Sequence, residues 1–452
     1  MTKIKDQFSL NEDQEAAIEL LRLFMWSNET FFLLSGCAGA GKTTVIQYFT
    51  EEIESISIAM TAPTNKAVKV LKSMDRATDH NVEYLTVYKL LDLTMGFESD
   101  EKVVVAREGS KSSLGQYDLV IIDESSQLSQ KLFDLLLDAG ERSGVKIVFI
   151  GDPAQLPPVK EGISPVFAAA ANDEFQEYRL TKNRRLNGDS NPLAEKIDAI
   201  RDRVFTPELW KKEIVLTPSY NKDKTQGLFV LDPDQWLKTM VQGFSNDQWQ
   251  KDPDSVRAIA WTNKTVNTIN QYVRAEVYGN PDKPYVIGER LIANAPVFNP
   301  GTDEILISNC GEMNVLWSEH EEKDDHGFPV WRLGVATEDN VTLHLTALDY
   351  DVEGTERRFK AHLDDLATSA MNETTHYKKR LKWRQYWTMK DKVYANLSYA
   401  YALTAHKAQG SSFRNVFIAQ KDILSNSNFE GKERYQCLYV AYSRARDRVF
   451  IC

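Results

Sequence analysis

The stretch GCAGAGKT, at residues 36–43, decides the fold of this 452-residue chain. It matches the phosphate-binding pattern G-x-x-x-x-G-K-[ST] at every position. The apolar run 31–34 before it predicts a strand, and apolar residues at helical spacing over 43–56 predict a helix after it. In such a loop the glycines let backbone N–H groups surround phosphates, and the helix start adds positive potential. The sequence therefore predicts a P-loop domain of the α/β class.

Two residues of this loop are suited to a nucleotide and its metal ion. Lys42 is expected to bridge the β- and γ-phosphates of ATP, and Thr43 to ligate Mg²⁺. ATP and Mg²⁺ are therefore the predicted cofactors. The other predicted ATP contacts in the loop and the first helical turn are Gly36, Gly39, Ala40, Gly41 and Thr44.

Two further apolar runs, 118–122 and 146–150, also end in polar residues. Apolar strands that alternate with helices indicate a parallel sheet covered on both faces, which binds ligands at the carboxyl ends of its strands. After the first run, Asp123 suits Mg²⁺ and Glu124 suits the base that activates the attacking water. After the second, Gln155 suits the orientation of that water.

A second set of apolar runs, at 256–261, 415–419 and 448–451, predicts a second sheet. The predicted fold class is α/β, with two similar parallel-sheet lobes and two inserted segments. A β-rich run at 102–106 predicts a hairpin in the first insert, and alternation such as that at 341–345 predicts a mixed, partly β second insert. The predicted boundaries are 1–79 and 116–190 for the first lobe, 80–115 for its insert, 191–284 and 392–452 for the second lobe, and 285–391 for its insert.

The composition is that of an ordinary soluble globular protein, with 42% hydrophobic and 26% charged residues. No apolar run approaches the roughly 20 residues of a membrane span, and the N-terminus has no apolar signal region. Four scattered cysteines argue against a disulfide framework or zinc site, so a cytoplasmic location is expected. The net charge of −11 argues mildly against a nucleic-acid coat protein, although a motor needs only a local basic groove.

Five more stretches follow a known order: FSLNEDQ at 8–14, APTNKA at 62–67, LTKNRR at 180–185, TAHKAQGS at 404–411 and YVAYSRAR at 439–446. With the phosphate loop and the acidic pair, they resemble the motifs of superfamily 1 helicases. The form TAHKAQGS is typical of the RecD- and PIF-like branch, superfamily 1B, which moves 5′ to 3′. The chain length, AWTNK at 260–264 and the order of the inserts are most similar to Dda-type helicases of T-even-like bacteriophages.

The resemblance implies that the two lobes are RecA-like, that ATP lies between them and that the second lobe supplies arginine fingers. It implies that Gln14 reads adenine, that Arg185 and Arg444 are the arginine fingers, and that Gly410 contacts ATP. The predicted catalytic residues are therefore Lys42, Glu124, Gln155, Arg185 and Arg444. The predicted DNA contacts are Pro63, Thr64, Asn65, Thr86, Tyr88, Asn263, Thr404 and His406, where His406 could instead order its own loop.

The chain departs from the family pattern at several positions. Tyr88 stands where this branch usually has a histidine, and Arg184 stands where the UvrD-like branch has an adenine-stacking tyrosine. The predicted hairpin has only valines at 103–105 where an aromatic strand-separating wedge is expected, and Phe97 is the nearest candidate. Which residue separates the strands therefore stays open.

A basic and aromatic stretch at 377–387 has two interpretations. Its cations and rings are typical of a nucleic-acid surface. Trp383, Tyr386 and Trp387, however, have the i, i+3, i+4 spacing of a buried helix face, with the cations on the solvated side. The buried helix face is the favoured interpretation.

The predicted function is that of an ATP- and Mg²⁺-dependent 5′→3′ DNA helicase that acts as a monomer. Its expected partners are single-stranded DNA and single-strand/duplex junctions, together with a phage or host replication or recombination protein. It is expected in the host cytoplasm if a phage encodes it. Three alternatives stay open: a translocase that does not unwind but displaces proteins or serves a nuclease, a P-loop ATPase switch, and an RNA helicase.

Overall fold

The computed structural model describes residues 10–53, 56–74, 82–98, 101–106, 112–158, 161–181, 191–212, 214–299, 304–425 and 431–452. The chain divides into two compact units. The first contains Met1–Leu93, Ala106–Ile269 and Leu403–Cys452, and the second contains Thr94–Val105 and Asn270–Ala402. The four-part division given above stays a prediction.

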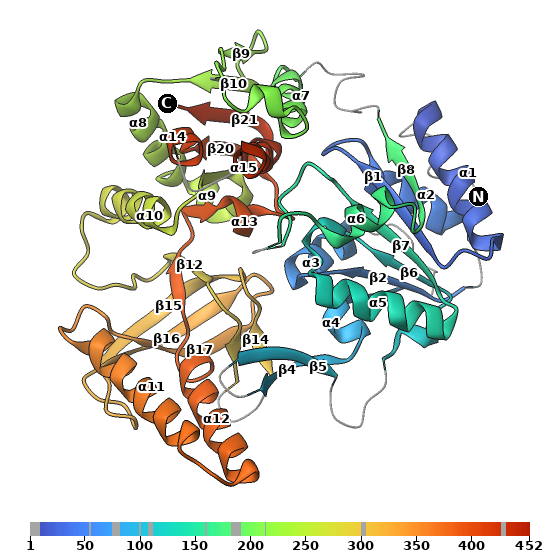
Figure 1. Ribbon diagram of the computed structural model, residues 1–452. Coiled ribbons are helices and arrows are strands. Elements are labelled where there is room, and N and C mark those ends of the chain that lie inside the picture. Colours follow the sequence, from blue (N-terminus) through green and yellow to red (C-terminus); the bar gives the residue numbers. More distant parts are fainter. Residues whose placement is uncertain are drawn as a thin grey trace. The chain divides into compact units, whose positions relative to one another are not determined.

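The first unit contains a six-stranded sheet in the order β3-β2-β6-β7-β1-β8, and every neighbouring pair is parallel (Figure 1). Its strands are β1 (Phe31–Gly36), β2 (Ile58–Ala62), β3 (Val82–Thr86), β6 (Leu119–Ile122), β7 (Lys146–Gly151) and β8 (Gln176–Leu180). The predicted strands at 31–34, 118–122 and 146–150 are thereby confirmed. Strands β1, β2 and β6 are buried at every residue, as the central strands of a sheet covered on both faces should be.

Helices connect these parallel strands. They are α1 (Glu12–Trp26), α2 (Lys42–Glu52), α3 (Asn65–Met74), α4 (Val87–Leu90), α5 (Gln130–Ser143) and α6 (Pro165–Ala171), with 3-10 turns η1 (Leu114–Gln116) and η2 (Ser125–Gln127). Helix α2 ends four residues before the predicted 56. The apolar faces of α1 and α2 pack with β1, β2, β6 and β7 in one core, which fixes the phosphate loop between β1 and α2.

A second sheet in the same unit has the order β19-β11-β20-β21-β10-β9. Its strands are β9 (Ser219–Tyr220), β10 (Gly227–Val230), β11 (Val256–Ala260), β19 (Ala402–Thr404), β20 (Phe413–Ile418) and β21 (Ala445–Ile451). Strands β11, β20, β21 and β10 are parallel, whereas the short β9 runs antiparallel to β10 at the edge. We call the parts built around the first and second sheets the first lobe and the second lobe.

The second sheet is accompanied by α7 (Leu193–Val204), α8 (Pro233–Phe244), α9 (Asp247–Lys251), α10 (Asn263–Tyr278), α13 (Ala405–Ala408), α14 (Gln420–Leu424), α15 (Gly431–Ser443) and the turns η4 (Pro207–Leu209) and η5 (Pro253–Ser255). Helix α15 is buried continuously from Tyr435 to Ser443. The predicted α/β class with two RecA-like lobes is confirmed, and the predicted runs in the second lobe coincide with β11, β20 and β21 within a few residues.

The second unit has a five-stranded sheet in the order β17-β16-β15-β12-β18, with antiparallel neighbours. Its strands are β12 (Arg290–Ala293), β15 (Glu312–Glu321), β16 (Val330–Thr337), β17 (Thr342–Leu348) and β18 (Leu397–Tyr399). Smaller pairs are β13 (Val297–Phe298) with β14 (Ile305–Ile307), and β4 (Leu93–Glu98) with β5 (Glu101–Ala106). The predicted strands at 102–106 and 341–345 are present. The side chains of Phe97 and of residues 103–105 lie outside the described part, so the wedge stays a prediction.

Two helices of the second unit, α11 (Thr355–Met371) and α12 (His376–Asp391), pack against each other. Trp383 and Trp387 are each 5% exposed and cluster with Ala370 of α11. The exposed cations Lys378 and Arg384 lie on the same helix. The interpretation of 377–387 as a buried helix face is therefore confirmed. In the described part of the chain, no helix is long and apolar enough to cross a membrane.

Candidate active site

The phosphate loop lies at the carboxyl end of β1, which is hydrogen-bonded between β7 and β8. Gly39 and Gly41 have φ of +85° and +87°, a left-handed backbone that favours glycine and lets the chain turn tightly. Lys42 Nζ donates to the carbonyl oxygens of Gly36 at 2.7 Å and Cys37 at 3.1 Å. The ammonium group of Lys42 therefore lies against the first two residues of the loop. Thr43 and Thr44 follow in the first turn of α2, both half-buried.

Gln14 of α1 is hydrogen-bonded to this loop. Asn11 and Gln14 form a capping box at the start of α1, which fixes the glutamine backbone. The Gln14 side chain is fully buried, and its Nε2 donates to Ala40 O at 3.2 Å. The predicted adenine-reading residue is thus held against the phosphate loop, and its contact with the base stays a prediction.

Gly41 is the loop position at which we expect an added side chain to weaken nucleotide binding most. A Cβ on Gly41 would lie 2.2 Å from Gln14 Nε2, and the left-handed φ would strain any other residue. We expect Gly41→Ala to weaken nucleotide binding by about tenfold or more, because strain of roughly 1–2 kcal/mol is added to the displacement of Gln14. Titration with a fluorescent ADP measures this.

Gly144→Ala is the matched control for that substitution. Gly144 ends α5 with φ +67°, and a Cβ there would meet nothing within 4 Å. This variant carries similar backbone strain away from the loop, so it should lose thermal stability but keep the nucleotide affinity of the wild type. Equal nucleotide affinities for the two variants would contradict the role of the Gly41–Gln14 contact.

The acidic pair stands at the carboxyl end of β6. The Asp123 N–H donates to Thr61 O at 2.8 Å, and Asp123 Oδ1 accepts the Glu124 N–H at 2.8 Å. Glu124 has a left-handed φ of +52°, which turns the chain out of the strand. Burial raises the pKa of Glu124, the neighbouring Asp123 raises it further, and the cations Arg444 and Lys42 oppose this. Burial also raises the pKa of Asp123.

The metal-ligand set at this edge is small. Asp123 and Thr43 supply the hard oxygen ligands that Mg²⁺ prefers. Among the described residues, no group of three or more His, Cys, Asp or Glu side chains could hold a metal. The two oxygen groups of Asp123 and Thr43 fit a Mg²⁺ ion, because Mg²⁺ in nucleotide sites usually takes only one or two carboxylates from the protein.

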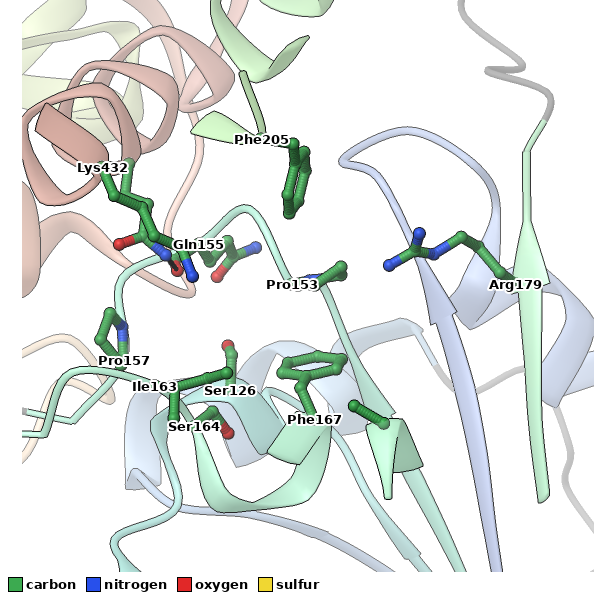
Figure 2. Close-up of a pocket in the computed structure, with 12 residues that line it drawn as sticks. Ser126, Pro153, Gln155, Pro157, Ile163, Ser164, Phe167, Arg179, Phe205 and Lys432 are labelled. Atoms are coloured by element: carbon green, nitrogen blue, oxygen red, sulfur yellow. Dashed lines mark hydrogen bonds between the residues drawn. The ribbon is translucent and has the colours of Figure 1, made fainter. Parts of the chain in front are cut away.

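Gln155 follows β7 and borders a cavity of about 230 Å³ in the first unit (Figure 2). The cavity walls combine Ser126, Phe167 and Phe205 with the cationic residues Arg179 and Lys432. Gln155 is 7% exposed, and neither its Oε1 nor Ser126 Oγ has a hydrogen-bond partner among the described residues. The amide oxygen of Gln155 is itself buried with its acceptor unused, and the orientation of water by Gln155 stays a prediction.

Three side chains of the second lobe hold loops of the first lobe. The Tyr439 hydroxyl accepts the Ala38 N–H and donates to Asp152 Oδ2. Gln436 Nε2 donates to Gln155 O at 2.8 Å, and Gln409 Nε2 donates to Leu156 O at 3.2 Å. The sequence interpretation missed these three residues. A signal existed for one of them, since Gln436 is an amide within the mostly apolar run 435–442.

Arg444 is buried at the junction of α15 and β21 and is 6% exposed. Its guanidinium donates to Val440 O, to Ser411 O and to Ser443 Oγ at 2.9–3.2 Å. Its positive charge opposes the rise that burial causes in the pKa of Glu124. Gly410, with φ +72°, precedes Ser411 in the loop that accepts from Arg444. Arg184 and Arg185 lie outside the described residues, and the finger roles of Arg185 and Arg444 both stay predictions.

The threonines predicted to contact DNA share one local geometry. Thr64, Thr86 and Thr404 each stand before a helix, and each Oγ1 accepts a backbone N–H three residues later, at 3.2–3.3 Å. Each hydroxyl keeps its own hydrogen to donate, and the N–H groups of a helix start attract anions. Among the other predicted contacts, Asn65 and Asn263 are exposed at the starts of α3 and α10, whereas Pro63 and Tyr88 are half-buried.

His406 packs against Trp261, with 5.0 Å between the ring centroids. Burial lowers the pKa of His406, which favours the neutral imidazole. A neutral ring packed on an indole favours the alternative in which His406 orders its loop. A DNA contact by His406 stays a prediction.

Known proteins match this chain over most of its length. Residues 9–204 match the family described as AAA domain, and residues 399–452 match the UvrD-like helicase C-terminal domain. An ATP-dependent DNA helicase, dda of Enterobacteria phage T4, is 25% identical over 98% of both chains. Uncharacterized protein R530 of Acanthamoeba polyphaga mimivirus is 25% identical over 97% of this chain and 98% of its own.

Among solved structures, the Pif1 helicase from Bacteroides in complex with ADP-AlF3 and ssDNA has the same fold. The two chains superpose with a TM-score of 0.52 at 17% identity, over 98% of this chain and 92% of the other. The motif order, the two family matches and these relatives agree with one another. The chain accordingly belongs to the RecD- and Pif1-like helicases of superfamily 1B, with phage Dda among its relatives.

Proposed function

We propose that this protein is an ATP-dependent DNA helicase that moves 5′ to 3′ along single-stranded DNA and separates duplex ahead of it. One observation carries the proposal: side chains of the second lobe hold the phosphate loop and the Gln155 loop of the first. A site built from two lobes couples hydrolysis to their relative movement, whereas a simple switch needs only one. The motif order and the phage relative support DNA as the track.

In this proposal each hydrolysis residue has its own role, which depends on where it lies in the site. Lys42 neutralises the β- and γ-phosphates, Glu124 accepts a proton from the attacking water, and Gln155 orients that water. Arg444 and Arg185 stabilise the charge that develops on the γ-phosphate from the second-lobe side. Thr43 and Asp123 would hold a Mg²⁺ ion, which would supply positive charge to offset that of the phosphates.

Movement requires that strand affinity differs between the nucleotide states, since equal affinity in both states would do no work. The proposed strand contacts belong to both lobes. Thr64 follows β2 and Thr86 ends β3 of the first sheet, whereas Asn263 follows β11 and Thr404 ends β19 of the second. If these two sets of residues bind the strand tightly in alternation, the strand would advance once per ATP cycle.

The remaining parts of the proposal concern the protein's setting. We infer that it acts as a monomer in the cytoplasm, in that of the host if a phage encodes it. Single-stranded DNA and single-strand/duplex junctions are its substrates, and a phage or host replication or recombination protein is its proposed partner. The predicted four-part boundaries, with inserts at 80–115 and 285–391, belong to this proposal.

The test is an ATPase measurement without polymer, with single-stranded DNA and with single-stranded RNA, with Lys42→Ala as the inactive control. Stimulation by DNA that is lost in Lys42→Ala supports the motor. A rate indifferent to both polymers would leave a P-loop switch, and stimulation by RNA alone would leave an RNA helicase. Tailed duplexes with 5′ or 3′ overhangs then fix polarity, and ATPase stimulation without strand displacement would identify a translocase.

Asp422 holds the proposed strand contact at the start of α10. Its carboxylate accepts four hydrogen bonds at 2.7–2.9 Å, from the Trp261 and Thr262 N–H groups and from the hydroxyls of Thr262 and Thr265. Asp422→Asn turns one acceptor oxygen into a donor and loses about half of these bonds. We expect single-stranded DNA affinity, measured by fluorescence anisotropy, to fall roughly three- to tenfold.

The ATPase rate without DNA should remain near the wild-type value in Asp422→Asn, since the residue lies apart from the phosphate loop. Asp223→Asn, at an exposed turn of the second lobe, is the matched control and should bind DNA normally. Wild-type DNA affinity in Asp422→Asn would exclude the start of α10 from the strand path.

A further inference from the structure

One hydroxyl of α15 connects the phosphate loop with the loop after β7. Tyr439 is fully buried, and its Oη accepts the Ala38 N–H at 2.8 Å and donates to Asp152 Oδ2 at 2.6 Å. Burial and the Asp152 carboxylate raise the pKa of Tyr439 well above its usual range, so the hydroxyl keeps its proton. It can therefore serve as donor to Asp152 and acceptor for Ala38 at once.

The Ala38 N–H belongs to a loop whose amides bind phosphate oxygens. A backbone N–H makes one strong hydrogen bond, so a phosphate oxygen that takes this donor must displace the tyrosine oxygen. Nucleotide and Tyr439 thus compete for the same group. The competition links nucleotide binding in the first lobe to a side chain of the second.

Contacts of Tyr439 and its helix connect it with Gln155 and Arg444, the two predicted hydrolysis residues concerned. Asp152 Oδ1 accepts the Ala154 N–H at 3.0 Å, which shapes the turn that leads to Gln155. Gln436, one turn before Tyr439 on α15, donates to Gln155 O. Arg444 follows at the end of the same helix and donates to Val440 O, the residue after Tyr439. A shift of Tyr439 therefore acts on the helix that positions Arg444.

We propose that Tyr439 is a positioning residue that reports phosphate binding at Ala38 to the Gln155 loop and to Arg444. This proposal rests on the proposed function only in assuming that ATP is the nucleotide and that hydrolysis is coupled to DNA binding. Tyr439 touches no reacting atom in this account. Its role is to make the arrangement of the second lobe depend on what the phosphate loop holds.

The first test is Tyr439→Phe, which keeps the ring and removes both hydrogen bonds. Phosphate then displaces no tyrosine oxygen, so affinity for ADP and for a non-hydrolysable ATP analogue should rise roughly two- to tenfold. The DNA-stimulated kcat should fall by about the same factor or more, because phosphate binding no longer changes the positions of Gln155 and Arg444 through Tyr439. A purely structural tyrosine would instead weaken nucleotide binding and activity together.

Tyr442→Phe is the matched control. Tyr442 is equally buried on the same helix, and its hydroxyl donates to Gln420 Oε1 at 2.7 Å, away from the phosphate loop. It should lose similar thermal stability without tighter nucleotide binding. Wild-type nucleotide affinity in Tyr439→Phe, or the same tightening in Tyr442→Phe, would overturn the proposal.

A second measurement does not depend on a variant that folds poorly. With 3-fluorotyrosine placed at 439 or at 442, the fluorine resonance at 439 should shift on addition of ADP or the ATP analogue, and the one at 442 should shift much less. An unchanged resonance at 439 would overturn the proposal. Both the affinity and the fluorine measurements omit DNA, so a wild-type ATPase that DNA fails to stimulate would count against the helicase function alone.

Discussion

Arg444→Lys should lower the DNA-stimulated kcat of this helicase by about 10³-fold, the lower end of the range for an arginine finger. Lysine keeps the positive charge but lacks the planar fork of donors that stabilises an equatorial phosphate oxygen while holding its own loop. In the structure the guanidinium uses that fork on Ser411 O and Ser443 Oγ. Single-turnover hydrolysis with saturating single-stranded DNA measures the loss.

A packing role of Arg444 has to be separated from a role in hydrolysis. Arg448→Lys is the control, since Arg448 lies on β21, the strand that begins directly after Arg444, and donates to Asn415 Oδ1 at 2.7 Å. If Arg444 serves hydrolysis, both variants keep similar melting temperatures and only Arg444→Lys loses kcat. A kcat within fivefold of wild type for a folded Arg444→Lys would remove Arg444 from the hydrolysis machinery.

Glu124→Gln is the second substitution with a large expected effect. The amide keeps the size of the side chain but cannot accept the proton of the attacking water, so kcat should fall on the order of 10²- to 10⁴-fold. Burial already raises the pKa of Glu124, and an uncharged amide there has a smaller desolvation cost than a carboxylate. Nucleotide affinity should therefore be preserved or improved, which titration with fluorescent ADP can verify.

Glu141→Gln, at an exposed position of α5, should leave both measurements unchanged. If Glu124→Gln hydrolyses ATP at the wild-type rate, another group is the base. If it fails to bind nucleotide, the effect is on site assembly, and the assignment of Glu124 as the base loses its support.

Much of the fold could be predicted from the sequence because the deciding information is local. The apolar run 31–34 and the glycines of the phosphate loop define β1 and the turn into α2 by neighbouring residues alone. The i, i+3, i+4 spacing of Trp383, Tyr386 and Trp387 likewise predicted the buried face of α12. The antiparallel edge strand β9, two residues long, carries too little pattern to be predicted.

The sequence alone determined the P-loop α/β class, the two RecA-like lobes and the family, and it predicted the residues that fit phosphate and Mg²⁺. Only the tertiary structure decided which side chains join distant segments. Ala38 and Tyr439 lie 401 positions apart, and the Trp261 N–H and Asp422 lie 161 apart. No local pattern predicts such a pair, because a hydrogen bond between two elements depends on how those elements pack.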